Sequence, residues 1–161
     1  MGQTGRSDVT AAFLYHFTQF VDWPPLKAGD AFTICIAGDQ ATTISVRSFT
    51  RDKFVGSHPV RVLLVEGPPE TRGCQLLFLA ACPTPRLQQY LTAVRDSGML
   101  IVGEQPEVLE LGGMVELFVQ RQRIAFSINN DAMQRAHLHV SSKVLRLARE
   151  AEESSIPGGG H

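Results

Sequence analysis

Apolar and polar residues alternate along this chain in a pattern that predicts helices and strands in turn. Residues 7–25 place apolar side chains three or four positions apart and end in two prolines, which predicts an amphipathic helix capped by Ser7 or Asp8. Continuous apolar runs bounded by turn residues predict buried strands at 32–39, 59–67, 74–81 and 99–104. Capped amphipathic stretches predict helices at 40–49 and 84–98.

The last third of the chain predicts a hairpin followed by helical segments. Apolar-rich runs within residues 114–128 flank Arg121 and Gln122, as in an antiparallel β-hairpin with a tight turn, although Asn-Gly or Asp-Gly is the favoured turn pair. A short helical turn is expected at residues 129–136, and a final helix at residues 142–153.

These elements together predict one α/β domain. A chain of 161 residues that is 43% hydrophobic is long enough for a single compact core. We expect a mostly parallel sheet flanked by helices, with a C-terminal antiparallel β-hairpin, over residues 8–152. Residues 1–7 and 153–161 are expected to be flexible tails.

Charge and hydropathy exclude several kinds of partner. The formal net charge is −1 and the basic residues are scattered, so we expect no nucleic acid as a partner. No stretch reaches the roughly 18 consecutive apolar residues that a membrane span needs. The first residues lack the apolar centre of a signal peptide, although the mature form of an exported protein would look the same.

Motifs for chemistry are scarce. His137 and His139 would face one side of an extended segment and could share a metal ion, but two ligands do not complete a zinc site. We favour a surface strand with two polar residues around an inward Leu138. No phosphate-binding loop and no G-x-S-x-G elbow is present. We therefore predict no catalytic residue, no metal and no cofactor.

The three cysteines leave two alternatives open. Cys35, Cys74 and Cys82 lack the C-x-x-C spacing of a redox or zinc motif. Cys35 lies in one apolar run and Cys74 precedes another, so the two meet if those runs form neighbouring strands. Otherwise both are small buried hydrophobic residues.

Several motifs in one order carry a resemblance to a known family. The segments "AAFLYHFTQFVDWP", "FTICIAGD", "CQLLFLA", "GGM" and "IAFSINNDAMQRAHLHVSSKVLRLA" resemble the YfiR family of small periplasmic proteins, over about residues 8–150. Relatives usually have glycine and a variable residue where this chain has His137 and His139. The resemblance therefore implies no shared role for the two histidines.

The resemblance implies a non-enzymatic regulator. The best-known family members bind the periplasmic domain of a membrane-anchored diguanylate cyclase and restrain it, which lowers cyclic-di-GMP and biofilm formation. An outer-membrane lipoprotein can sequester them, and they are commonly homodimers. A small-ligand sensor is the alternative, using the carboxyl edge of the sheet around Asp39 and Glu104. Asp39 is also an ordinary helix N-cap, which is the structural interpretation of that residue.

The resemblance also implies roles for individual residues. Cys35 and Cys74 occupy family motif positions in a protein expected in the periplasm, where disulfides persist, so we expect them to pair while Cys82 stays reduced. For partner binding we single out Leu14, Phe20 and Trp23, because the first helix has more large apolar side chains than one face can bury. The alternative is that these side chains pack against the sheet.

Overall fold

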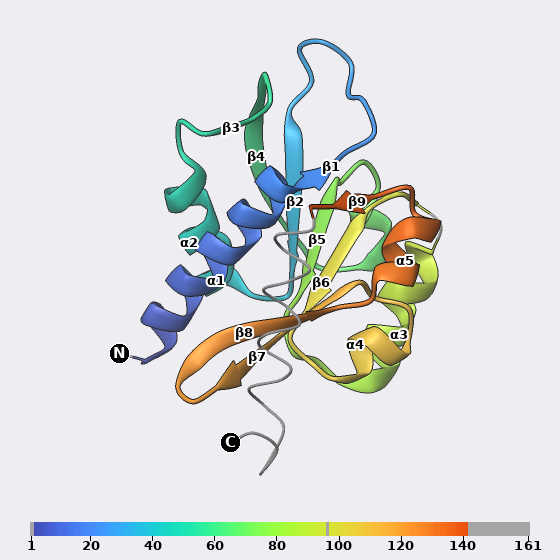
Figure 1. Ribbon diagram of the computed structural model, residues 1–161. Coiled ribbons are helices and arrows are strands. Elements are labelled where there is room, and N and C mark those ends of the chain that lie inside the picture. Colours follow the sequence, from blue (N-terminus) through green and yellow to red (C-terminus); the bar gives the residue numbers. More distant parts are fainter. Residues whose placement is uncertain (1, 96, 142–161) are drawn as a thin grey trace.

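A seven-stranded sheet forms the centre of the protein (Figure 1). The structure is a computed structural model that describes residues 2–95 and 97–141. In spatial order the strands are β3 (Phe54–Val55), β4 (His58–Val65), β2 (Phe32–Ala37), β5 (Leu76–Leu79), β6 (Leu100–Gly103), β7 (Val115–Gln120) and β8 (Arg123–Ile128). Strands β4, β2, β5, β6 and β7 are parallel, and the short β3 and the long β8 are antiparallel additions at the two sides. The predicted fold class is thereby confirmed.

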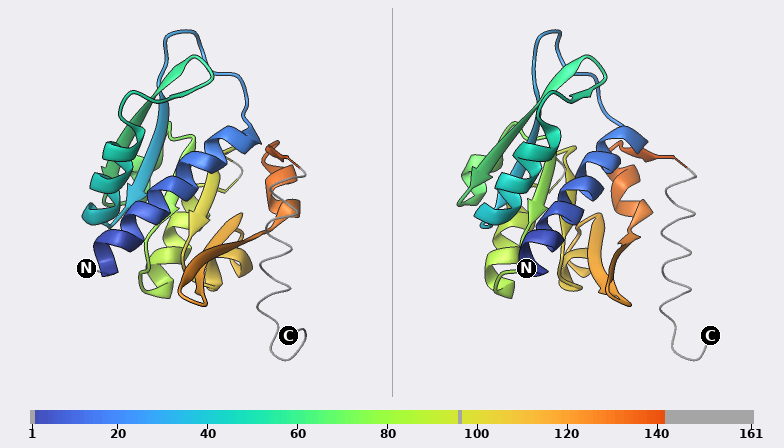
Figure 2. Two further views of the ribbon diagram at one scale, coloured as in Figure 1. Left: turned by 60° about the vertical axis from the view of Figure 1, so that its left-hand side comes forward. Right: turned by 90° about the vertical axis from the view of Figure 1, so that its left-hand side faces the viewer.

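Helices cover both faces of the sheet (Figures 1 and 2). One face carries α1 (Gly2–Phe20) and α2 (Gln40–Thr50), and the other carries α3 (Thr84–Ala93), α4 (Glu107–Glu110) and the 3₁₀-helix η1 (Pro68–Thr71). Every residue of β2, β5 and β6 is buried as a result. This coverage explains the continuous apolar runs of the sequence, because a strand covered on both sides has no solvent-exposed face for polar residues.

Two very short strands join the beginning and the end of the described chain. Strand β1 (Val21–Asp22) pairs antiparallel with β9 (His139–Val140), which follows helix α5 (Asn130–Arg135). Figure 1 shows the pair at the end of α1, away from the free tip of the β7–β8 hairpin. The final helix expected over residues 142–153 lies outside the described residues.

The tight hairpin predicted around Arg121 and Gln122 is confirmed. Strands β7 and β8 pair in register from Val115 opposite Ile128 to the turn, and Arg121 and Gln122 have φ angles of 52° and 65°. Positive φ at both central positions is the signature of the type I′ turn, which matches the natural twist of paired strands. The turn therefore forms with two residues that favour this conformation much less than Asn-Gly does.

The first helix differs from its prediction in two ways. It begins at Gly2 rather than at Ser7 or Asp8, and Ser7 is buried instead of capping a helix end. From residue 7 onward its buried residues are Ser7, Thr10, Ala11, Leu14, Phe17 and Thr18. This stripe has helical spacing but mixes small and polar residues with large ones. It is rotated away from the apolar stripe that the sequence indicates, Val9, Phe13, Phe17 and Phe20, of which Val9 is exposed.

Candidate functional site

The carboxyl edge of the sheet, the ligand site of the alternative prediction, uses its polar side chains to fix turns. The Asp39 carboxylate accepts hydrogen bonds from the amides of Ala41 (3.1 Å) and Thr42 (3.3 Å) and from the Thr42 hydroxyl (2.6 Å), so it is the N-cap of α2. A Glu104 oxygen accepts from the Ala81 amide at 3.0 Å. Asp39 follows β2 and Glu104 follows β6, and β5 lies between those strands. The two carboxylates therefore hold separate turns.

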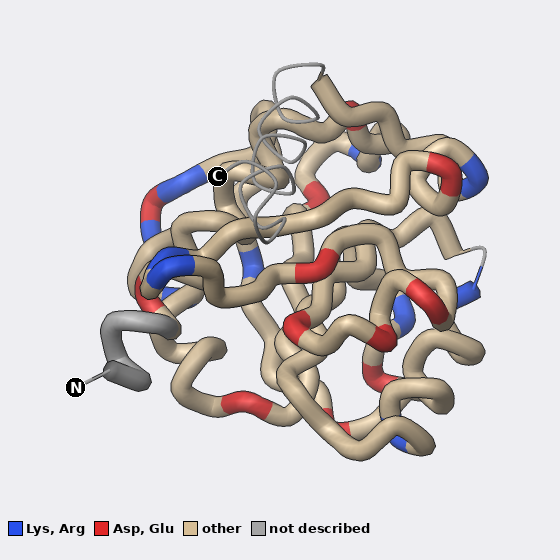
Figure 3. The backbone as a smooth tube through the Cα atoms, turned by 60° about the horizontal axis from the view of Figure 1, so that its bottom comes forward, with Lys and Arg blue, Asp and Glu red and all other residues tan. Residues whose placement is uncertain are grey.

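This edge is acidic. Seen from the side of the carboxyl ends, acidic positions gather around the centre of the molecule and most basic positions lie toward its periphery (Figure 3). Glu66 follows β4, and Glu107 lies in the turn of helix after β6. Burial raises the pKa of the nearby Glu116 carboxyl, and the charge of Glu107 raises it further. A concentration of negative charge disfavours phosphate and carboxylate ligands at this edge.

A row of three side chains that the sequence analysis did not single out lies beside η1. Cys82, Arg86 and Tyr90 stand four residues apart along α3 and the residues before it, a spacing that could have identified them as one face of a helix. The Arg86 guanidinium lies over the Tyr90 ring, 5.5 Å from its centroid, and donates to the carbonyl oxygen of Glu66. Burial raises the pKa of the Cys82 thiol, and Arg86 offsets this only in part. A thiol held in its neutral form is a weak nucleophile.

The two histidines lie on the surface but not in one strand. His137 has a φ of 61° and is the left-handed residue that ends α5, because the Leu138 amide donates to the Met133 carbonyl (2.9 Å) and the His137 amide donates to Gln134 (3.0 Å). His139 begins β9, and both rings are exposed around the fully buried Leu138.

This geometry corrects the idea of an extended H-x-H segment, and it places His137 in a conformation that glycine adopts without strain. Within residues 2–95 and 97–141, no group of three or more His, Cys, Asp or Glu side chains could hold a metal ion.

The predicted contact residues of the first helix have different environments. Leu14 is fully buried, so the expectation that the first helix leaves it unburied is wrong and it offers no surface to a partner. Phe20 and Trp23 are half-buried against the core. The Trp23 indole N–H donates to the Thr18 carbonyl at 3.0 Å, and its ring meets Phe32 edge-on at a centroid distance of 4.8 Å. Trp23 therefore packs on the end of the sheet and still exposes part of its ring.

A shallow hollow lies beside Trp23. It has a volume of about 350 Å³ and is bounded by the residues after α1, including Pro24, Pro25 and Leu26, and by the β3–β4 turn with Val55. Half-exposed aromatic and aliphatic side chains around a hollow are the usual setting of an interface anchor. This Trp23 hollow is the described feature that best suits a protein partner.

The two predicted sulfur partners do meet. Cys35 on β2 and Cys74 just before β5 form a disulfide with a Cα–Cα distance of 6.0 Å, and both residues are buried. Cys82 is a free thiol. Of the two alternatives that the residues left open, the neighbouring-strand arrangement is correct, because β2 and β5 are adjacent parallel strands.

Comparison with known proteins identifies a family and a fold. A family model described as YfiR/HmsC-like matches residues 7–149. No curated protein matches the chain. A conserved domain protein from Vibrio cholerae O1 biovar El Tor strain N16961 has a crystal structure that matches 88% of this chain with a TM-score of 0.58 and 9% identity. The ABC domain from Streptococcus pneumoniae, solved in complex with L-Trp, matches 73% of this chain with a TM-score of 0.54 and 13% identity.

The chain spans only 58% and 54% of the lengths of these two solved proteins. At such low identity the likeness shows the fold alone. No helix in the described part of the chain is both long enough and apolar enough to cross a membrane.

Proposed function

The chain belongs to the YfiR/HmsC-like family, and on this premise we propose that it is a non-enzymatic periplasmic regulator that binds and restrains a membrane-anchored signalling protein. The match over residues 7–149 is the observation that carries the proposal, because it covers nearly all of the described fold. The side chains at the carboxyl edge support it as well, since Asp39 and Glu104 stabilise turns there.

The partner proposed for this regulator is the periplasmic domain of an inner-membrane diguanylate cyclase. Binding would lower the output of the cyclase and thus cyclic-di-GMP. An outer-membrane lipoprotein that sequesters the regulator, and a homodimer as the binding form, belong to the same proposal. The Trp23 hollow is the proposed contact, because Trp23 combines partial exposure with firm attachment to the core. Phe20, also half-buried but outside the hollow, is proposed as a second contact.

The test is to express the protein with and without a membrane cyclase of its host and to measure cyclic-di-GMP and complex formation. We expect the intact protein to bind the cyclase and lower cyclic-di-GMP. Trp23→Ala should weaken binding by about tenfold or more, which is typical of an interface anchor. Val119→Ala is the matched control, because Val119 is an exposed apolar residue on the β7–β8 hairpin, outside the Trp23 hollow.

Folding must be checked first, since Trp23 also contacts Phe32. Circular dichroism and the melting temperature of each variant serve this purpose. If the intact protein neither binds nor inhibits any membrane cyclase of its host, the regulator proposal fails. If folded Trp23→Ala and Val119→Ala bind the cyclase equally well, the Trp23 hollow is not the contact with the partner.

A further inference from the structure

A cavity at the amino-terminal edge of the sheet lies on the opposite side from the acidic edge. Its volume is about 620 Å³, within the range of roughly 300–1,000 Å³ that small-molecule sites occupy. Helix η1, the end of α3 and the residues that lead into β5 and β6 surround it. Its apolar wall consists of aliphatic side chains without an aromatic ring, among them Pro68, Ala93, Val94 and Met99.

Most polar groups of this cavity already have partners. The Thr71 hydroxyl donates to the Pro68 carbonyl at 2.6 Å, and the Ser97 hydroxyl accepts from the Met99 amide at 3.3 Å. The Gln75 side chain accepts from the Thr33 amide at 2.6 Å and donates to a carbonyl at 3.2 Å. These groups shape the walls of the cavity, and a ligand would have to compete with existing bonds to use them.

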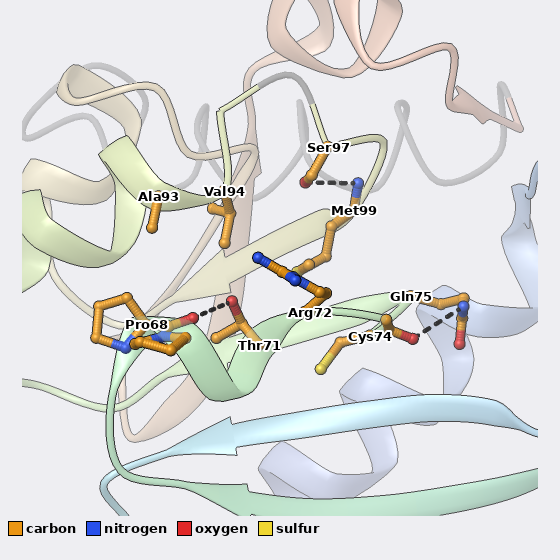
Figure 4. A pocket seen from close by; sticks show the side chains of 11 residues that line it. Pro68, Thr71, Arg72, Cys74, Gln75, Ala93, Val94, Ser97 and Met99 are labelled. Atoms are coloured by element: carbon orange, nitrogen blue, oxygen red, sulfur yellow. Dashed lines mark hydrogen bonds between the residues drawn. The ribbon is translucent and has the colours of Figure 1, made fainter.

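Arg72 is the exception. Figure 4 shows its side chain among the lining residues, with the guanidinium in the middle of the cavity between the η1 wall and Met99. No hydrogen bond or ion pair within the described residues engages this guanidinium, and it carries five N–H donors in a planar fork. Its backbone is held on both sides, by the buried Thr71 and by Cys74, which is fixed to Cys35 through the disulfide. Arg72 is exposed to solvent, and an arginine without a partner among the described residues, on an anchored segment, is suited to bind an anion.

We propose that this cavity binds a small organic anion with an aliphatic body, its carboxylate paired with Arg72 and its chain against Val94 and Met99. A planar carboxylate matches the guanidinium fork with two parallel hydrogen bonds. The aliphatic wall buries the rest of the ligand, which an inorganic anion does not offer. The distribution of charge supports the same choice, since the acidic residues of the opposite edge repel anions there.

Hexanoate is a suitable probe, and isothermal titration of the full, oxidised protein measures its binding at constant ionic strength. For a ligand of this size we expect one site with a Kd on the order of 1 mM. Two further probes separate the parts of the ligand, because 1-hexanol has the chain without the charge and inorganic phosphate has the charge without the chain. Both should bind about tenfold more weakly than hexanoate.

Two variants locate the site. Arg72→Gln should weaken hexanoate binding about tenfold or more and leave 1-hexanol unaffected, because only the charged pair is lost. Ala93→Phe should weaken binding of both, because its ring occupies the cavity from the exposed end of α3. Arg61→Gln is the matched control, since Arg61 is an exposed arginine on β4 that does not line the cavity.

The proposal is overturned if hexanoate shows no saturable binding below about 20 mM, a limit well above the expected Kd. It is overturned equally if Arg72→Gln binds hexanoate as tightly as Arg61→Gln does. Binding of phosphate as strong as that of hexanoate would also contradict it, because the site would then recognise charge without an organic body.

Discussion

Removing the Cys35–Cys74 disulfide tests how much this covalent link stabilises the fold. The variant is Cys35→Ala together with Cys74→Ala, which replaces two buried cysteines by small apolar residues and adds no polar group to the core. The bridge spans 39 residues of sequence. In the chain-entropy model a closed loop of this length restricts the unfolded chain enough to stabilise the native state by about 4 kcal/mol. A domain whose total stability is about 5–15 kcal/mol would lose a large part of it.

Urea unfolding followed by circular dichroism measures this change as a shift of the midpoint. Heating should give a melting temperature lower by roughly 10 °C, as expected for a domain of this size. Reduction of the unaltered protein with dithiothreitol should reproduce the loss, whereas the double variant should be insensitive to it. Cys82→Ala is the matched control, because Cys82 is unpaired and its removal leaves the bridge intact. A loss below about 1 kcal/mol in the double variant would refute the reasoning.

Three smaller changes test local features. His137→Gly should raise the free energy of unfolding by about 0.5–1 kcal/mol, because φ is 61° there, and a lower urea midpoint would contradict this. Gln122→Gly should give a similar gain in the hairpin turn, where φ is 65°, and an unchanged midpoint would argue against turn strain. The pKa of Glu116 is raised by burial and then by Glu107, so this carboxyl binds its proton more tightly in the folded state. Its contribution to stability is present below the ordinary glutamate pKa of about 4.3 and is lost as the pH rises above it. Glu116→Gln should therefore stabilise the protein at pH 7 by less than about 1 kcal/mol and have no effect at pH 3. Equal effects in urea titrations at both pH values would disprove the assignment.

Periodicity predicted the long elements of this fold well. The strands β2, β5 and β6 correspond to apolar runs because helices cover both faces of the sheet there, and the apolar run of β4 predicted a strand that is only partly buried. Helix α2 begins at Gln40, directly after the Asp39 cap. The two-residue strands β1, β3 and β9 had no such signal. A pair of residues has no period. The partners β1 and β9 also lie far apart in the sequence, so tertiary contacts alone specify them, whereas β3 pairs with the neighbouring β4 through a tight turn.

The first helix shows why the candidate contact residues were harder to predict. Thr10 and Thr18 are buried although they are polar, and the Thr18 hydroxyl donates to the Tyr15 carbonyl within the helix. A threonine that satisfies its hydroxyl in this way packs like a small apolar residue. A prediction from hydrophobicity alone therefore missed the buried stripe of the helix, which runs through Thr10, Leu14 and Thr18. The cavity around Arg72 could not be predicted from the sequence either. Arg72 lies in a loop, outside any periodic pattern, and the other residues that line the cavity come from separate elements.

The contacts of α1 also determine when this helix can dock during synthesis. Phe13 and Phe17 pack edge-on against Phe126, at centroid distances of 5.8 Å and 5.2 Å, and β1 pairs with β9. Phe126 lies more than 100 residues after Phe17 in the sequence, so the apolar face of this helix lacks its β8 partner until β8 has been synthesised. Such long-range closure slows folding and leaves apolar surface open to aggregation. Until β8 is in place, the apolar face of α1 is therefore surface that a chaperone can bind.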